Sequence, residues 1–275
     1  MTEVELGAYR LEIANEFGPR IVSLRRDDSP ELFAQLSDDH AIEHAGGIYR
    51  FHGGHRLWAA PENPEVTYAN DDHTCSVSVE NGTAKVLGPP DSAGLVKSIV
   101  LTSKGESLLI EHRIAGGQAA QRLAAWAITQ FPLGGKAILP LAGEDTGPRP
   151  NRNLVLWPYT NLDDPRLQFG ESVALVAAGD GSPLKLGFGP MPQRLGYLRD
   201  GWLFMKETGS PPRRTVPDFG AVSQIYLGQG FCELESVGEL TAIDDQSALV
   251  SEVWSVVACD DETTASHLVL GGRPT

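Results

Sequence analysis

The sequence predicts an all-β protein, and three observations support this prediction. Alternating or apolar runs along the chain give roughly fifteen short strands and little helix. The 275 residues include 30 glycines and 19 prolines, which suit the turns between such strands. Hydrophobic residues make up 41% of the chain, enough for a sizeable core. We therefore expect one sandwich or barrel domain spanning residues 1–275, since no linker or fixed-period repeat divides the chain.

The first elements are predicted from short local patterns. Ala8–Ile13 alternates between polar and apolar residues, as a half-buried strand does. A Gly-Pro turn then leads into a second strand at Arg20–Leu24. Ser29–Phe33 predicts a short helix, because its serine can cap the first turn and its proline can take the first helical position.

Further strands follow from the same patterns. One run, Leu123–Gln130, is apolar on both faces except at its end, which is typical of a strand covered on both sides. A short buried helix is the alternative for this run, because periodicity does not separate the two. The other expected strands are Cys75–Val79, Ala84–Leu87, Val96–Leu101, Ser107–Ile114, Asn153–Trp157, Val173–Ala177, Leu184–Phe188, Leu195–Arg199, Trp202–Met205, Val222–Leu227, Phe231–Val237 and Leu249–Ala258.

Charge, cysteines and motifs exclude several classes of protein. The formal net charge of -14 argues against nucleic-acid partners and against binding to anionic membranes. No apolar run approaches the ~20 residues of a membrane span. Three widely spaced cysteines without a CxxC pair suggest neither a zinc site nor a disulfide framework. We expect no metal and no cofactor. The N-terminus lacks the features of a secretory signal, and we expect a cytoplasmic protein. HExxH, GxSxG, P-loop and GxGxxG motifs do not occur.

The densest polar chemistry lies in residues 51–62. A Gly-Gly pair permits unusual backbone angles and close approach of a ligand to the main chain, and a tryptophan offers a flat apolar platform with a polar edge. This stretch predicts the floor of a binding site; the alternative is a turn with solvated histidines. Its candidate ligand-binding residues are His52, His55, Arg56, Trp58 and Glu62.

Two glutamates on one predicted strand form a second candidate group. Glu233 and Glu235 are two residues apart and share one face of the strand, whereas Cys232 and Leu234 take the other face. The glutamates lie between apolar neighbours, which can raise the pKa of a carboxyl group toward catalytic use. They could also pair with a cation such as Arg56 or Lys206, or lie in water on a surface strand.

Two further segments supply possible sugar contacts. Lys206 shares a strand face with two aromatic residues, which suits stacking against a sugar plus one hydrogen-bond donor. A core strand whose lysine reaches out to solvent fits the same pattern. In the polar loop 157–166, Trp157, Tyr159 and Asp163 could all meet a ligand. Structural capping of the loop by Asp163 is the alternative for that residue.

Taken together, these segments resemble the galactose mutarotase-like (aldose 1-epimerase) superfamily, in an uncharacterised branch of it. The resemblance covers nearly the whole chain in the same order and implies a β-supersandwich, mostly antiparallel, with a sugar site on its concave face. It rests on Phe17–Leu24, Gly53–Trp58 with Pro61-Glu62, Trp126–Gln130, Leu156–Thr160 with Asp164–Arg166, and Glu233–Ser236.

The resemblance also implies roles for individual residues. In mutarotases a glutamate near the C-terminus takes the proton of the anomeric hydroxyl, and a mid-chain histidine protonates the ring oxygen. Glu235 resembles the base, because Leu-Glu fits the family pattern, and His52 of His-Gly-Gly resembles a substrate-binding histidine. The loop that matches the family's acid has no histidine, so His55, or else Tyr159, is expected to substitute.

Two function classes follow. The first is an enzyme that acts on a monosaccharide or sugar derivative by acid/base chemistry at the anomeric carbon, like an aldose 1-epimerase. The second is a non-catalytic carbohydrate-binding protein that kept the cleft and lost the acid. In both, the partner is a small-molecule carbohydrate, and an enzyme needs a titratable donor within ligand reach of the base.

Overall fold

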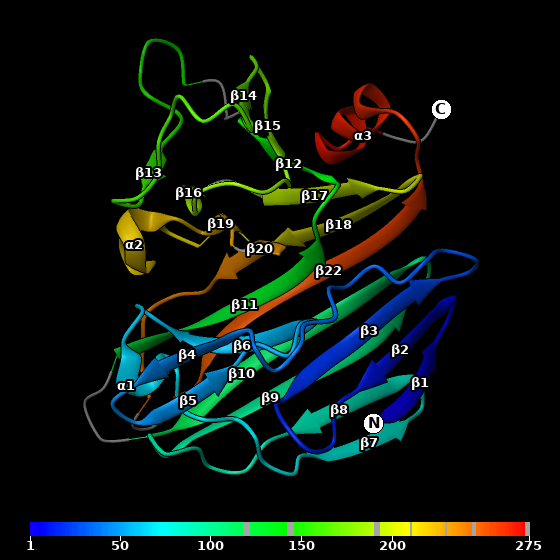
Figure 1. The fold of residues 1–275 in the computed structure, drawn as a ribbon, viewed down its shortest axis with the longest axis vertical. Helices are drawn as coiled ribbons and strands as arrows, with labels where there is room; N and C mark the ends of the chain where they lie inside the picture. Colours follow the sequence, from blue (N-terminus) through cyan, green and yellow to red (C-terminus); the bar gives the residue numbers. More distant parts are fainter. Residues whose placement is uncertain are drawn as a thin grey trace.

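Strands dominate the protein and form two large sheets that pack face to face (Figure 1). In this computed structural model 52% of residues lie in strands and 7% in helices. The structure describes residues 1–117, 122–141, 146–189, 193–209, 211–228, 230–243 and 246–272. The prediction of an all-β, mostly antiparallel architecture is confirmed.

The first sheet carries the candidate site. Its described strands number ten, and all of its pairings are antiparallel. Their order is β1 (Thr2–Leu6), β2 (Tyr9–Ile13), β3 (Arg20–Arg26), β6 (His55–Ala60), β11 (Arg122–Pro132), β20 (Phe231–Val237), β19 (Ser223–Leu227), β16 (Leu184–Phe188) and β13 (Leu154–Leu156), with β21 (Thr241–Ala242) paired to β11.

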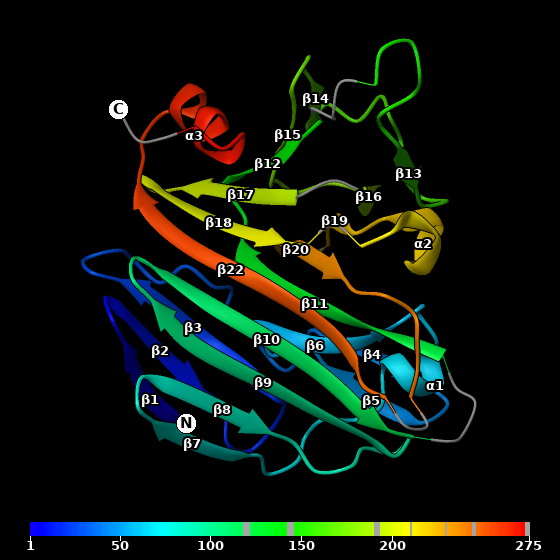
Figure 2. The same ribbon diagram turned by 180° about the vertical axis from the view of Figure 1, so that it is seen from behind.

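The second sheet lies behind the first and also has ten described strands. Figure 2 views the molecule from the side of this sheet. The order is β14 (Leu167–Phe169), β15 (Val173–Ala177), β12 (Lys136–Pro140), β17 (Gln193–Arg199), β18 (Trp202–Thr208), β22 (Ala248–Ala258), β10 (Ser107–Gly116), β9 (Leu95–Lys104), β8 (Thr83–Leu87) and β7 (Ser76–Glu80).

The remaining elements are a small hairpin and several short helices outside the two large sheets. A separate hairpin pairs β4 (Ala41–His44) with β5 (Gly47–Arg50). The helices are α1 (Pro64–Thr67), α2 (Pro217–Gly220), α3 (Glu262–Val269) and a 3-10 turn η1 (Arg213–Thr215). Of these, α3 packs on β12 and β17 at the end of the molecule opposite to β1–β3 (Figure 1). None of the helices among the described residues is long and apolar enough to cross a membrane.

The strand β11 shows why its sequence is apolar throughout. Ala125 and Ala127 face the core between the two sheets, whereas Ala124, Trp126 and Ile128 join a second apolar cluster on the outer face of the first sheet. Successive side chains of a strand point to opposite faces, so a strand buried on both sides needs apolar residues at every position. The prediction of a strand here is confirmed, and the alternative of a helix is wrong.

The short helix expected at Ser29–Phe33 does not form, because this segment has no helical assignment. Instead, the Glu31 carboxylate accepts hydrogen bonds from the main-chain N–H groups of Leu24 and Phe33, both at 3.0 Å. These bonds hold the segment against the end of β3 in an open conformation. Local capping signals therefore lose to tertiary hydrogen bonds at this position.

Candidate functional site

A cavity of about 330 Å³ opens on the face of the first sheet that is turned away from the second sheet. Its size and its mostly apolar lining are those of an ordinary small-ligand site. Six strands (β4, β6, β11, β16, β19 and β20) and several connecting segments contribute to it. The lining residues are Ile42, Phe51, Arg56, Trp58, Glu62, Tyr68, Trp126, Tyr159, Pro183, Lys185, Tyr226 and Glu233.

Half of the residues that line the cavity are aromatic. The Trp58 ring lies edge-on to Trp126 at 5.4 Å and to Tyr68 at 5.2 Å between ring centroids. Tyr159 and Tyr226 form a further edge-on pair at 6.5 Å. Such rings offer flat apolar faces together with polar edges, which suits a ligand that has both apolar and hydroxyl-bearing surfaces.

The Trp58 wall is anchored to the β4–β5 hairpin by hydrogen bonds. Its indole N–H donates to the Tyr49 hydroxyl at 2.8 Å. The Arg20 guanidinium donates to the same hydroxyl at 2.8 Å, and the hydroxyl itself donates to Asp71 Oδ2 at 3.3 Å. Arg20 and Asp71 also form an ion pair at 3.1 Å. The orientation of Trp58 is thus fixed by a buried polar chain.

Arg56 and Glu233 form the first of two ion pairs at the cavity floor. Arg56 Nη2 donates to Glu233 Oε1 at 2.8 Å, and both side chains are almost fully buried. The guanidinium also lies 4.0 Å from the Trp58 ring and 5.1 Å from the Phe51 ring. Stacking and charge together hold this arginine in one position.

Lys185 and Glu235 form the second ion pair. Lys185 Nζ and the Trp126 indole N–H both donate to Glu235 Oε2, at 2.9 and 2.8 Å. The ammonium lies 4.4 Å from the Trp126 ring and 4.9 Å from the Trp157 ring. Burial raises the pKa of the Glu235 carboxyl; Lys185 opposes this shift, and the charge of nearby Glu233 adds to it.

Strand register explains why these groups meet. In one cross-strand row, Glu233 of β20 lies opposite Tyr226 of β19, which lies opposite Lys185 of β16. In the next row, Arg56 lies opposite Ile128, which lies opposite Glu235. Side chains in such rows share one face of a sheet, so residues separated by up to 177 positions converge on the cavity.

The structure brings together many of the residues expected from the sequence. Arg56, Trp58, Glu62, Tyr159 and Glu233 all line the cavity. Trp157 does not line it, but the Lys185 ammonium lies over its ring, 4.9 Å from the centroid.

Glu235 takes a different place from Glu233. Its side chain is fully buried behind Trp126 and Lys185, and it does not line the cavity. The two glutamates share a strand face as expected, and Cys232 and Leu234 lie in the core on the other face. Of the two glutamates on β20, Glu233 is therefore the one whose carboxylate faces the cavity.

His55 lies away from the cavity, contrary to the expectation that it shares the cleft with Arg56. Neighbours on a strand point to opposite faces, so His55 faces the space between the sheets. Its Nδ1 lies 2.9 Å from Thr129 Oγ1, and its Nε2 lies 2.7 Å from His112 Nε2. Burial lowers the pKa of both imidazoles, and for His55 the neighbouring His112 lowers it further.

Lys206 also lies between the sheets, so the expectation that it binds a ligand in the cleft does not fit its position. It is fully buried, and its Nζ pairs with Glu252 Oε1 at 2.7 Å. The alternative that its side chain reaches out to solvent is wrong as well. Burial lowers the pKa of the Lys206 ammonium, while Glu252 opposes this shift.

His52 and the two glycines after it have structural contacts. The His52 ring stacks on Phe17 at 4.0 Å, and its Nε2 lies 2.8 Å from Asp72 Oδ1. Gly53 and Gly54 have φ angles of +86° and +73°, and a Cβ on them would lie 2.0 and 2.2 Å from main-chain oxygens. The Gly-Gly pair is therefore explained by close packing of main chain on main chain.

Potential metal ligands meet at one place among the described residues. His55, His112 and Glu252 bring ligand atoms within 4.8 Å of one another. However, the Lys206 ammonium and the Trp254 indole N–H already occupy the Glu252 carboxylate, each at 2.7 Å. We therefore describe this group as a hydrogen-bonded cluster and assign no metal ion to it.

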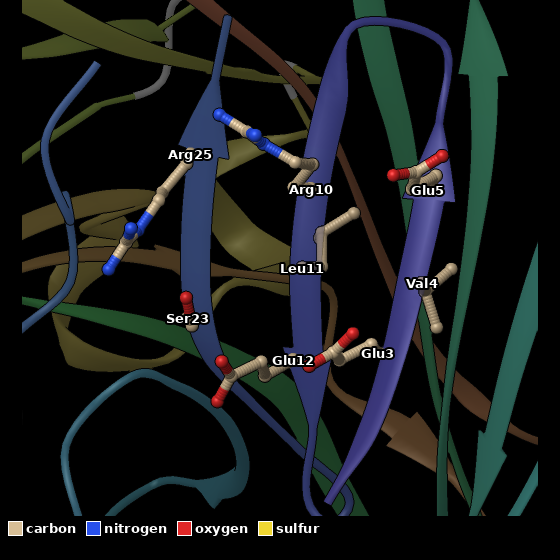
Figure 3. A pocket seen from close by; sticks show the side chains of 8 residues that line it. All are labelled: Glu3, Val4, Glu5, Arg10, Leu11, Glu12, Ser23 and Arg25. Carbon is tan, nitrogen blue, oxygen red and sulfur yellow. The ribbon is translucent and has the colours of Figure 1, made fainter. Parts of the chain in front are cut away.

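A second hollow of about 240 Å³ lies on the outer face of β1–β3 (Figure 3). Figure 3 shows acidic and basic side chains spread over the three strands. The charged residues that line it, Glu3, Glu5, Glu12, Arg10 and Arg25, are all largely exposed. This hollow lacks the aromatic walls and the buried charges of the first cavity.

Sequence reasoning did not identify several of the cavity residues. Lys185, Tyr226 and Tyr68 line the cavity but were not expected there, and Trp126 was expected only as part of a strand. One signal was present for Lys185: it is the single charge in the apolar strand Leu184–Phe188. A charge in such a strand is rarely buried without a partner, so it points to a pairing elsewhere in the chain.

The sequence by itself matches no family model and no curated protein. Solved structures do match. A candidate aldose 1-epimerase of Escherichia coli K12 is 12% identical with a TM-score of 0.55, covering 93% of this chain and 98% of that one. A galactose mutarotase related enzyme of Lactobacillus acidophilus is 8% identical with a TM-score of 0.55, covering 95% and 98%. A TPR-domain containing protein of Parabacteroides distasonis is 10% identical with a TM-score of 0.61, covering 99% of this chain and 48% of that one.

At these identities the likeness concerns the fold. The chain has a galactose mutarotase-like fold, and at this level the resemblance found in the sequence is confirmed.

Proposed function

We propose that the protein binds a monosaccharide or sugar derivative in the aromatic cavity and interconverts its anomers by acid/base catalysis. One observation carries the proposal: a cavity of about 330 Å³ in which aromatic walls meet two carboxylate–cation pairs. Aromatic faces suit the apolar face of a sugar ring, and fixed charges suit its hydroxyl groups. The fold, shared with proteins named for mutarotation, supports the same ligand class.

In this proposal Glu233 is the base. Anomer interconversion begins when a base removes the proton of the anomeric hydroxyl, and such a group must lie within hydrogen-bond reach of the proton. Glu233 lines the cavity, whereas Glu235 is fully buried with two donors on its Oε2. We therefore propose Glu233, and not Glu235, as the base. Glu235 instead positions Lys185 through their ion pair.

Polarimetry on a panel of aldoses tests the catalytic half of this proposal. Glu233→Gln should slow the equilibration of an accepted sugar by ~10²–10⁴-fold, because the amide keeps the shape of the side chain but cannot accept a proton. Sugar binding, measured by calorimetry, should persist. Asp91→Asn, at a buried ion pair on a different part of the molecule, serves as the control. Full activity in Glu233→Gln together with a larger loss in Glu235→Gln would overturn the choice of base.

A sugar-binding protein without catalysis is the second candidate. It is favoured by the absence of histidine among the cavity-lining residues of the described chain and by the pairing of both glutamates with cations. If the wild-type protein binds an aldose but does not speed its mutarotation, the protein is a sugar-binding protein without catalysis. In either case we place the protein in the cytoplasm, because its three cysteines are free thiols, as is usual in reducing compartments.

A further inference from the structure

We infer that Lys185 is the acid of this site and donates a proton to the ring oxygen of the bound sugar. The inference rests on the proposed function, since it names the second half of the same acid/base pair. It fills the position for which no histidine is available, because His55 faces the other side of the sheet.

The other donors that line the cavity are less suited to this step. Arg56 cannot give up a proton in a protein. Burial raises the pKa of the Tyr226 hydroxyl to about 12, with Glu233 adding to the effect, and burial also raises the pKa of Tyr159. Tyr68 already donates its hydroxyl proton to Glu62. Lys185 is the remaining cavity-lining residue of the described chain that carries a transferable proton on nitrogen.

The position of Lys185 relative to Glu233 fits a reaction at the anomeric carbon. The two residues flank Tyr226 in one cross-strand row, so their Cα atoms lie two strand spacings, or about 10 Å, apart. Their side chains both line the cavity, as does that of Tyr226. The anomeric hydroxyl and the ring oxygen are bonded to the same carbon, so a ring placed between the two residues presents one oxygen to each.

Lys185 is also held more firmly than a surface lysine. Its ammonium lies between the rings of Trp126 and Trp157 and pairs with Glu235. Its main chain exchanges two hydrogen bonds with the Thr160 hydroxyl, at 2.6 and 3.0 Å. Thr160 follows Tyr159 directly, so these bonds join the cavity loop to the strand that carries the lysine. Positioning of this kind is what an effective proton donor requires.

The proton transfers balance over one cycle. Glu233 accepts the proton of the anomeric hydroxyl while the Lys185 ammonium protonates the ring oxygen, and the bond between the anomeric carbon and the ring oxygen breaks. The products are an open-chain aldehyde, a neutral carboxyl group and a neutral amine. After rotation about the next carbon–carbon bond, Glu233 returns its proton to the aldehyde oxygen and the hydroxyl released from the ring returns its proton to Lys185. The ring closes on the opposite face.

Two variants of Lys185 separate proton donation from charge. Lys185→Gln removes both, and Lys185→Arg keeps the charge but cannot transfer a proton. If Lys185 is the acid, both variants should lose ~10²–10⁴-fold in the rate of aldose equilibration, with sugar binding retained. Lys97→Arg, at a buried lysine–aspartate pair on β9, is the matched control and should keep the wild-type rate.

Chemical rescue is a second test, because added amines would not restore the rate if Lys185 had a purely structural role. In Lys185→Ala, added primary amines should restore part of the rate, with the recovery depending on the pKa of the amine.

Wild-type activity in Lys185→Arg, or an absence of rescue by any amine in a folded Lys185→Ala protein, would overturn the inference and leave the proposed function intact. A wild type that binds sugar without speeding mutarotation would overturn both.

Discussion

Two clusters of buried charge lie on opposite faces of the first sheet, and they differ in one respect. At the cavity floor, Glu233 and Glu235 pair with Arg56 and Lys185 beside about 330 Å³ of open space. Between the sheets, Glu252 pairs with Lys206, and His55 contacts His112, with the Trp254 ring packed on His55. Similar ion pairs therefore occur in an open environment and in a filled one.

This difference shows that burial of charge does not by itself mark a functional site. In the inter-sheet cluster, burial lowers the pKa values of both histidines and of Lys206, yet packed side chains surround the cluster. The cavity cluster has a clear shift at Glu235 and room for a ligand beside it. Perturbed groups at a cavity are candidates for chemistry, whereas those in a filled core specify how the sheets pack.

The largest effect on stability is expected when the ion pair between Lys206 and Glu252, which lies between the sheets, is broken. Lys206→Met should lower the free energy of unfolding by about 3–5 kcal/mol, because it leaves the Glu252 carboxylate buried without its cation. Arg56→Met should cost less, about 1–3 kcal/mol, because water in the cavity can solvate Glu233. Urea unfolding of both variants measures the difference. Equal costs at the two sites would contradict the distinction drawn between them.

A smaller effect concerns pH. The pKa values of His55 and His112 lie below their ordinary value, chiefly through burial, so an unfolded chain takes up protons near pH 6.5 that the folded chain does not. The free energy of unfolding should therefore fall as the pH drops below about 6.5, by at most about 1.4 kcal/mol per pH unit for each histidine.

The variant His55→Asn should flatten this slope between pH 7 and pH 5 and leave sugar binding unchanged, because His55 lies outside the cavity. Chemical unfolding at several pH values measures the slope. An unchanged slope would mean that His55 titrates normally in the folded protein, and a loss of sugar affinity would place it in the site.

The smallest effect is expected on the outer face of β1–β3. Arg25 pairs with Glu31 at 3.4 Å, and its side chain is 52% exposed. Arg25→Ala should change the free energy of unfolding by less than about 1 kcal/mol, since exposed ion pairs contribute little, and should not alter sugar binding. A clear loss of affinity would identify the hollow of Figure 3, and not the aromatic cavity, as the ligand site.

Most of the fold followed from sequence because strand patterns are local. The run Leu123–Gln130 was predicted as a strand covered on both faces, and β11 is that strand. Ser29–Phe33 shows where local patterns fail. Its capping signals are local, but its conformation is set by the hydrogen bond from the β3 main chain to the Glu31 carboxylate. Tertiary contacts of that kind leave no periodic trace in the sequence.

The candidate site was only partly predictable. The alternation that places Arg56 and Trp58 in the cavity also turns His55 away from it, so this error was avoidable from the sequence. Lys185 was not recoverable in the same way. Its partner Glu235 lies 50 positions away, and only the pairing of β16, β19 and β20 brings the two together.

The hydrogen bond from Trp58 to Tyr49 has a thermodynamic consequence for the β4–β5 hairpin. The hairpin pairs only with itself among the described strands, and the hydrogen bonds from Trp58 through Tyr49 to Arg20 and Asp71 are one of its links to the first sheet. A ligand that fixes Trp58 therefore also favours the ordered hairpin, and by reciprocity an ordered hairpin tightens ligand binding. Slower amide hydrogen exchange along residues 41–50 would report occupancy of the cavity from outside it.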